Sequence, residues 1–155
     1  MASSSNENER DPDAVRTHIT PTLQTALAIA ISSGSAGRNR FVRELLEKMT
    51  PQDLVVVVDN HGRTALFEAV WIDNMEGAKM LVSKNSELPN VVDESGMTPL
   101  HSAAMFGFRE MVLYLMELTS EDILLDDDAG AYLLCLLTRS EMYGEYFFLF
   151  FDRLW

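Results

Sequence analysis

Short apolar segments recur along the chain, each near the start of a similar block of residues. Three of them begin at equivalent positions, Thr64, Thr98 and Tyr132, which are 34 residues apart in both steps. A weaker copy begins at Thr25, 39 residues before Thr64, and the additional residues fit into loops at 34–37 and 50–51. Repetition at this period predicts a solenoid of similar structural units.

A second apolar segment follows each of the first ones. Its apolar residues are spaced to share one face of a short amphipathic helix. The four sets are Phe41, Val42, Leu45 and Leu46; Ala78, Leu81 and Val82; Val112, Leu115 and Met116; and Tyr146, Leu149 and Phe150. The pattern therefore predicts an all-α protein with two helices in each block, in about four stacked helix-turn-helix units.

The polar segments before the last three blocks share the pattern Asp-x-x-Gly. Their glycines are Gly62, Gly96 and Gly130. A glycine in a short polar connection supplies the positive φ that a hairpin turn needs. We expect hairpin-like tips at residues 59–63, 93–97 and 127–131.

The block at residues 93–116 resembles the ankyrin repeat. Its matching residues are Thr98, Pro99, Leu100, His101, Ala103, Ala104 and Gly107. The resemblance implies an ankyrin-repeat solenoid in which the threonine caps the first helix, the histidine ring bonds loop backbone, and the glycine ends the helix. It also implies inward positions for Leu66, Leu81, Leu100, Ala103, Val112 and Leu115.

The other blocks depart from this pattern. The first has Leu23 at the tip-glycine position, and the second has Phe67 in place of the histidine. In the second block Asp73 and Asn74 replace the helix-ending glycine, and asparagine tolerates that backbone conformation. The fourth block has Cys135 at the histidine position, where we expect a small buried apolar group. Imperfect first and last blocks are typical of a solenoid, because terminal units cap the stack.

The repeats predict one domain at residues 18–155, preceded by a polar, acidic segment at 1–17 that is expected to be disordered. The predicted repeats are approximately 18–58, 59–92, 93–126 and 127–152.

Two stretches, residues 41–54 and 78–85, resemble a plant group of ankyrin-repeat proteins. Members of that group carry a membrane-spanning PGG domain, which this sequence lacks, and are linked to defence and stress signalling. This narrower resemblance implies a role in such signalling. An alternative is that the chain is the soluble part, or a truncated relative, of a membrane-associated signalling or channel-like ankyrin protein.

The charge of the chain restricts its partners. It has 24 acidic and 12 basic residues and a net charge of −12. Such a surface repels phosphate backbones and anionic lipid, which disfavours nucleic acid and direct membrane insertion. The longest apolar run, residues 146–151, is far shorter than a membrane span. We expect a cytoplasmic protein, with attachment to the cytosolic side of a membrane through a partner as an alternative.

The sequence offers few candidates for catalytic, cofactor-binding or metal-binding residues. The histidines His18, His61 and His101 are scattered, with no cysteine or carboxylate at metal-ligand spacing. The segment at 34–37 lacks the Gly-Lys-Ser/Thr ending of a phosphate loop, and the aspartates at 126–128 lack EF-hand spacing. We therefore predict no catalytic residues, no cofactor and no metal, and a protein that is not an enzyme.

The two positions after the small residues of the first helix point into the concave groove of ankyrin repeats. Here they are occupied by Trp71, Ile72, Met105 and Phe106. Exposed apolar patches usually mark binding sites, so we predict a protein–protein interaction scaffold that binds its partner there. The alternative is that a loop or the next repeat covers these side chains. Tip residues expected to add specificity are Asn60, His61, Arg63, Glu94, Ser95 and Met97.

The C-terminal segment is unusually aromatic for the end of a solenoid. Phe147 and Phe151 are four residues apart and would share the exposed face of the last helix, with Trp155 shortly after. A solenoid normally ends in a polar face. The sequence therefore predicts that a second copy, a partner or a missing continuation covers this end, and we favour self-association or the continuation.

Overall fold

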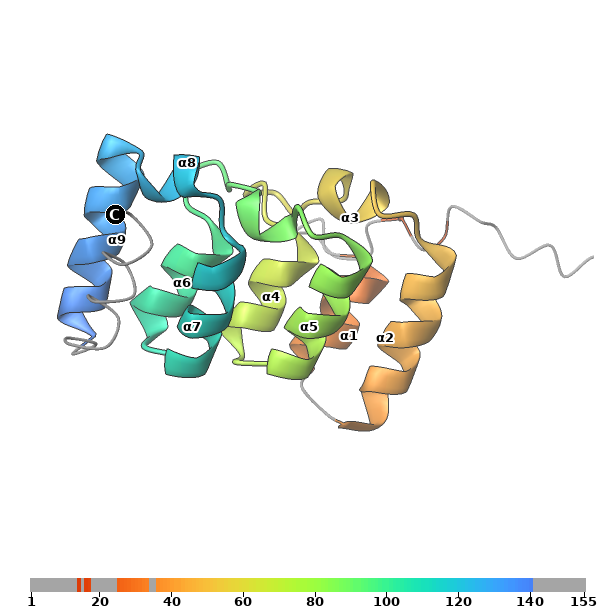
Figure 1. Ribbon diagram of the computed structural model, residues 1–155. Helices are drawn as coiled ribbons and strands as arrows, with labels where there is room; N and C mark the ends of the chain where they lie inside the picture. Colours follow the sequence, from red (N-terminus) through yellow and green to blue (C-terminus); the bar gives the residue numbers. More distant parts are fainter. Residues whose placement is uncertain (1–13, 15, 18–24, 34–35, 141–155) are drawn as a thin grey trace, which may run out of the picture.

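The computed structural model describes residues 14, 16–17, 25–33 and 36–140. Its helices form pairs that stack along one direction (Figure 1). The pairs are α1 (Ala26–Ser32) with α2 (Ala36–Lys48), α4 (Ala65–Trp71) with α5 (Met75–Lys84), and α6 (Pro99–Phe106) with α7 (Arg109–Leu118), and then α9 (Asp127–Arg139) follows. One-turn helices connect them: α3 (Asp53–Val56), η2 (Leu88–Asn90) and α8 (Glu121–Leu124).

The helices lie in two layers. The first helix of each unit packs on the first helix of the next, in the order α1, α4, α6 and α9. The second helices form the other layer, where α2 packs beside α5. The described part of the chain contains no β-strand, so the predicted all-α stack of helix-turn-helix units is confirmed. The expected second helix of the fourth unit lies outside the described residues.

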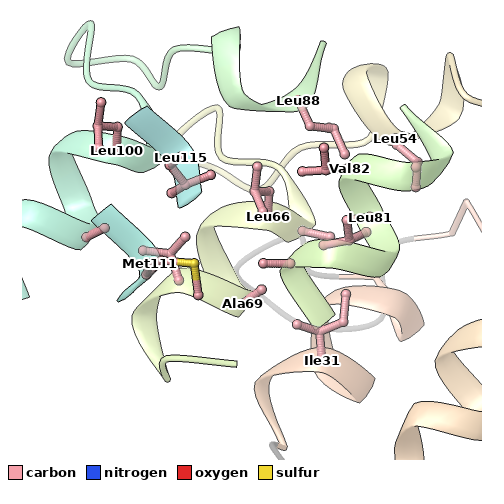
Figure 2. Packing of buried hydrophobic residues seen from close by; sticks show 14 of the residues in the cluster. Ile31, Leu54, Leu66, Ala69, Leu81, Val82, Leu88, Leu100, Met111 and Leu115 are labelled. Carbon is pink, nitrogen blue, oxygen red and sulfur yellow. The ribbon is translucent and has the colours of Figure 1, made fainter. Parts of the chain in front are cut away.

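One continuous apolar core runs through the stack. Figure 2 shows Leu66 of α4 among residues from α5, α6 and α7. The six positions predicted to point inward (Leu66, Leu81, Leu100, Ala103, Val112 and Leu115) are all fully buried. A Leu→Ala change at such a site typically costs about 2–5 kcal/mol of stability. Each unit therefore depends on its neighbours for its core.

The third unit has the predicted helix ends. Thr98 and His101 form a reciprocal capping box at the start of α6, and Pro99 occupies the first turn. At the other end Gly107 has φ of 76°, a left-handed conformation that glycine adopts without steric cost. Gly62 and Gly96 also have positive φ. The predicted tips at 59–63 and 93–97 are thus present.

The predicted tip at 127–131 is wrong. The chain there is helical, because α9 begins at Asp127 and continues through Gly130 without a positive φ. Tyr132 stands at the predicted position of the threonine that immediately precedes the first helix in each of the other units. The helix instead begins after Asp126, whose side chain accepts hydrogen bonds from two backbone N–H groups.

Gly130 has a different role from the one predicted. A Cβ atom at this position would lie 2.3 Å from the carbonyl oxygen of Leu124. Glycine is therefore needed because α9 passes very close to the end of α8, and not for the shape of a turn.

The fourth unit is also shifted by one residue relative to the predicted alignment. Leu133 is fully buried, as Leu66 and Leu100 are, so 33 residues separate the third and fourth units at this core position. This shift moves Cys135 from the histidine position to the next one. Cys135 is exposed, so the expectation of a buried cysteine is wrong.

The end of α4 differs in detail from the expectation. Asp73, and not Asn74, takes the left-handed conformation, with φ of 53°. Asn74 caps the next helix, since its side chain accepts a hydrogen bond from the backbone N–H of Gly77 at 2.9 Å. An aspartate thus occupies the place that Gly107 has in the third unit.

Part of the N-terminal segment contacts the first unit. The guanidinium of Arg16 donates two hydrogen bonds to the carboxylate of Asp53 in α3, at 2.8 and 3.0 Å. The hydrogen bonds from Arg16 hold the pKa of Asp53 well below its usual range, and a backbone bond from Thr50 adds to this. Most of the 1–17 segment lies outside the described residues, as do Phe147, Phe151 and Trp155. None of the helices described is both long enough and apolar enough to cross a membrane.

Candidate partner-binding surface

Four large apolar side chains are exposed at the ends of two neighbouring first helices. Trp71 and Ile72, at the end of α4, are 38% and 40% exposed. Met105 and Phe106, at the end of α6, are 41% and 47% exposed. Because α4 packs against α6, the two pairs belong to adjacent units. We call these four residues the central patch.

The equivalent positions in the outer units are polar. Alignment by the buried leucines places Ser32 and Ser33 at these positions in the first unit, and Thr138 and Arg139 in the fourth. The hydroxyls of the two serines donate to carbonyls of their own helix. At these positions, the described residues are therefore large and apolar in the two middle units and polar in the first and fourth.

The tip of the second unit supports Trp71. The guanidinium of Arg63 lies 4.0 Å from the centroid of the Trp71 ring, a cation–π arrangement. Arg63 in turn forms an ion pair with Asp59, with an N–O distance of 2.6 Å. Burial would raise the pKa of Asp59, but hydrogen bonds from Arg63 and His61 outweigh it and hold that pKa below its usual value. These contacts restrict the orientation of the indole before any partner binds.

Phe106 also has an aromatic neighbour within its own unit. Its ring lies 5.6 Å from that of Phe108, in a tilted arrangement. Phe108 is partly exposed and extends the apolar surface beyond the residues predicted from the sequence. Phe108 directly follows the helix-ending Gly107, and the repeat pattern does not indicate which way the side chain at this position points.

The predicted tip residues lie along two connected turns. Four of them are exposed, namely Asn60, His61, Glu94 and Ser95, and the other two, Arg63 and Met97, are partly buried. The backbone N–H of Glu94 donates to the carbonyl of His61 at 3.0 Å, which joins the two tips. The tips are thus held in fixed register with each other.

His101 fastens the third unit to the fourth. Its Nδ1 accepts a hydrogen bond from the backbone N–H of Thr98 at 3.2 Å, so Nε2 carries the proton and donates to the carbonyl of Ala129 at 2.9 Å. Burial lowers the pKa of His101, partly offset by the Ala129 bond and the charge of Asp93. This is the predicted structural role. In the second unit Phe67 replaces the histidine, and the buried hydroxyl of Thr64 has no hydrogen-bond partner among the described residues.

Three or more histidine, cysteine or carboxylate side chains never come together in a metal-binding arrangement within the described ranges.

Family models for ankyrin repeats match the chain in two places. A model described as ankyrin repeats in three copies matches residues 2–91, and one described as ankyrin repeats in many copies matches residues 74–116. A solved structure with the same fold is a chain from the crystal structure of the yeast ribosomal protein Rps3 in complex with its chaperone Yar1. The TM-score is 0.61 at 23% identity, over 71% of this chain and 77% of that one. The predicted ankyrin-repeat fold is confirmed.

Similar sequences occur among animal proteins. Protein phosphatase 1 regulatory subunit 27 of Homo sapiens is 33% identical over 89 residues, which are 57% of this chain and 53% of the relative. The Notch-regulated ankyrin repeat-containing protein of Xenopus tropicalis is 31% identical over 98 residues, 63% of this chain and 82% of the relative. The chain thus matches about half the length of the human regulatory subunit. The narrower resemblance to plant proteins with a PGG domain stays a prediction.

Proposed function

The chain belongs to the ankyrin-repeat family, and on that basis we propose that it is a non-catalytic scaffold that binds another protein through the central patch and the two tips beside it. Ankyrin repeats and the similarity to a regulatory subunit and to a Notch-regulated repeat protein support a protein-interaction role. The identity of the partner is a separate question.

The observation that carries this proposal is the exposure of four large apolar side chains on adjacent units. Contiguous exposed apolar surface is uncommon on monomeric proteins unless it takes part in binding. Tryptophan is also enriched among the residues that contribute most to binding energy. Because Arg63 already orients Trp71, little side-chain entropy remains to be lost on association.

The extent of the binding unit is part of the proposal. We assign it to residues 18–155, with the repeats at about 18–58, 59–92, 93–126 and 127–152, and the 1–17 segment outside it. A role in stress or defence signalling, and the alternative of a membrane-associated relative, remain predictions based on the plant resemblance.

Affinity capture with matched variants tests the proposed site. The intact chain is compared with Trp71→Ala/Phe106→Ala and with Val56→Ala/Leu125→Ala, a control that removes exposed apolar side chains elsewhere on the molecule. Proteins retained by the intact chain and the control should be lost with the patch variant, since truncating an aromatic anchor costs about 2 kcal/mol or more. Circular dichroism should show all three folded. Equal capture by the patch variant and the control contradicts the proposal.

Self-association through Phe147, Phe151 and Trp155 is a separate prediction outside the described residues. Light scattering on the intact chain and on Phe147→Ser/Phe151→Ser tests it. We expect a larger mass for the intact chain than for the variant, and a monomeric mass for both contradicts the prediction.

A further inference from the structure

A groove of about 480 Å³ lies on the opposite layer of the stack, between α2 and α5. All of its lining residues come from these two helices. Leu46 and Met80 provide its apolar part, and charged side chains surround them. It shares no residue with the central patch, which lies at the ends of α4 and α6. A ligand in this groove would therefore leave the central patch free.

The two helices that form the groove are the basic part of an acidic chain. Half of the 12 Lys and Arg residues of the whole sequence are in α2 and α5, together with three of the 24 acidic ones. The basic residues are Arg38, Arg40, Arg43, Lys48, Lys79 and Lys84, and the acidic ones are Glu44, Glu47 and Glu76. The local charge thus has the opposite sign to the net charge of −12.

Ion pairs within this surface neutralise two of its three carboxylates. Arg40 lies 3.1 Å from Glu44, and Arg43 lies 3.1 Å from Glu76. Asn39 also donates to the Glu76 carboxylate. Of these contacts, the Arg43–Glu76 ion pair joins two lining residues and links α2 to the beginning of α5.

The remaining charges in this region are mostly positive. Lys48 and Lys84 form no ion pair with any residue that the structure describes. They are in the last turns of α2 and α5, which run side by side. The ammonium of Lys79 lies 5.8 Å from the centroid of the Tyr114 ring. The only carboxylate of the lining that remains without an ion pair to a described residue is that of Glu47.

We propose that this groove binds an acidic amphipathic helix of a second partner protein, with apolar side chains on Leu46 and Met80 and carboxylates beside Lys79 and Lys84. Lys79 and Lys84 are five residues apart in α5, which corresponds to a rise of about 7.5 Å along the helix axis. Carboxylates one turn apart on a ligand helix are separated by about 5–6 Å along its axis, so the long lysine side chains can reach both. Glu47 disfavours a carboxylate on the α2 side and thereby sets the orientation of the ligand.

A helix fits better than an extended strand. The groove is walled by two helices whose backbone groups bond within each helix, so no free sheet edge is available to pair with a strand. An amphipathic helix packs its side chains between two others by the same ridge-and-groove contacts that hold the stack together.

Other occupants fit less well. A second copy that docked through the same surface would place two basic grooves face to face, and their like charges disfavour this contact. The acidic segment at residues 1–13 has the correct charge, but Met1 is its only large apolar side chain. A partner helix supplies both the negative charge and the apolar face.

A titration of the intact chain with designed peptides tests the proposal. The probe is a helical peptide of about 18 residues, or five turns, with leucines on one face and glutamates beside them. The comparison peptide has lysines in place of the glutamates. On the isotope-labelled chain, the acidic peptide should shift the NMR signals of Leu46, Met80 and Ser83, and the lysine peptide should not.

Variants of the chain assign the effect to the groove. Lys79→Glu/Lys84→Glu should weaken binding of the acidic peptide by on the order of tenfold or more, because two attractive charges become repulsive. Arg139→Glu, a charge reversal at an exposed residue of α9, should change it little, and Trp71→Ala/Phe106→Ala should leave it unchanged. Three results overturn the proposal: no shifts in the groove, equal binding of the lysine peptide, or concentration-dependent dimerisation that shifts the same signals without peptide. None of these outcomes bears on the central patch.

Discussion

In the third unit, His101 lies between Thr98, at the start of α6, and the Ala129 carbonyl of the next unit. In the second unit, Phe67 takes that position, and the Thr64 hydroxyl is buried with no hydrogen-bond partner in the part of the chain that the structure describes. The ends of the two helices differ as well, since Gly107 occupies the left-handed position in one and Asp73 in the other. Both units nevertheless build the same helix pair.

The difference shows that the features of the repeat are separable. Apolar packing of the first helices is sufficient to form the second unit, whose Leu66 and Phe67 are almost completely buried. The capping box and the glycine determine the two ends of α6, and the His101 ring also ties the third unit to its neighbour. The second unit has polar contacts elsewhere, because Asp59 and Arg63 hold its tip against Trp71.

The largest effect on stability is expected when the histidine of the third unit is replaced by the phenylalanine that the second unit has at the same position. His101→Phe leaves the Thr98 N–H without its partner and removes the hydrogen bond to the Ala129 carbonyl, so the free energy of unfolding should fall by about 2–4 kcal/mol. Urea unfolding at pH 7.5 measures this. A loss below about 0.5 kcal/mol would mean that the histidine does not fasten the third unit to the fourth.

A matched pair of Thr→Val changes should have effects of opposite sign. Thr64→Val removes a buried hydroxyl that bonds to none of the described residues, and should stabilise the protein by about 1 kcal/mol. Thr98→Val removes the hydroxyl of the capping box, and should destabilise it by about 1–2 kcal/mol. Thermal and urea unfolding of both variants provide the comparison. Destabilisation by the two changes to the same extent would remove the distinction between the units.

A second exchange, between the residues with left-handed backbone conformation at the ends of α4 and α6, should have a smaller effect on stability. Asp73→Gly relieves the steric cost of a positive φ and should stabilise the second unit by up to about 1 kcal/mol. Gly107→Asp should destabilise the third by about 1 kcal/mol. Unfolding midpoints in urea measure both. If Asp73→Gly destabilises the protein, the aspartate contributes more than its backbone conformation indicates.

The smallest effect is expected in the dependence of stability on pH. Because burial lowers the pKa of His101 below the value of about 6.5 in unfolded chains, the unfolded state binds the proton more readily. The contribution of His101 is therefore complete above about pH 6.5 and decreases as the pH falls below it. His101→Phe should lose less stability than the unmodified chain between pH 7.5 and 5.5. Parallel curves over that window would contradict the buried, neutral histidine.

The sequence predicted most of the third unit because its residues act locally. Thr98, His101 and Gly107 each determine a helix end within a few positions, so their spacing is sufficient to place α6. The same reasoning was wrong at residues 127–131, where an Asp-x-x-Gly pattern occurs without the threonine that precedes the first helix in the other units. There the helix starts earlier, and Gly130 is needed for the close approach of Leu124, a contact that no local pattern indicates.

The candidate site was predictable only in part for the same reason. The positions of Trp71 and Phe106 follow from the repeat, and the structure leaves both exposed. The cation–π contact between Arg63 and Trp71 depends on how the tip folds back over α4. The groove between α2 and α5 depends on the packing of residues more than 30 positions apart, such as Arg43 and Glu76. Neither arrangement has a signal in the spacing of residues.

Hydroxyl-radical footprinting of the chain, free and in complex with a captured partner, tests the central claim most directly. Tryptophan and methionine side chains oxidise readily when exposed, so Trp71 and Met105 report on the central patch, and Leu125 serves as an exposed reference outside it. We expect oxidation of Trp71, Met105 and Phe106 to fall in the complex while that of Leu125 is unchanged. Unchanged oxidation of Trp71 and Met105, with protection of a different surface, would contradict the proposed site.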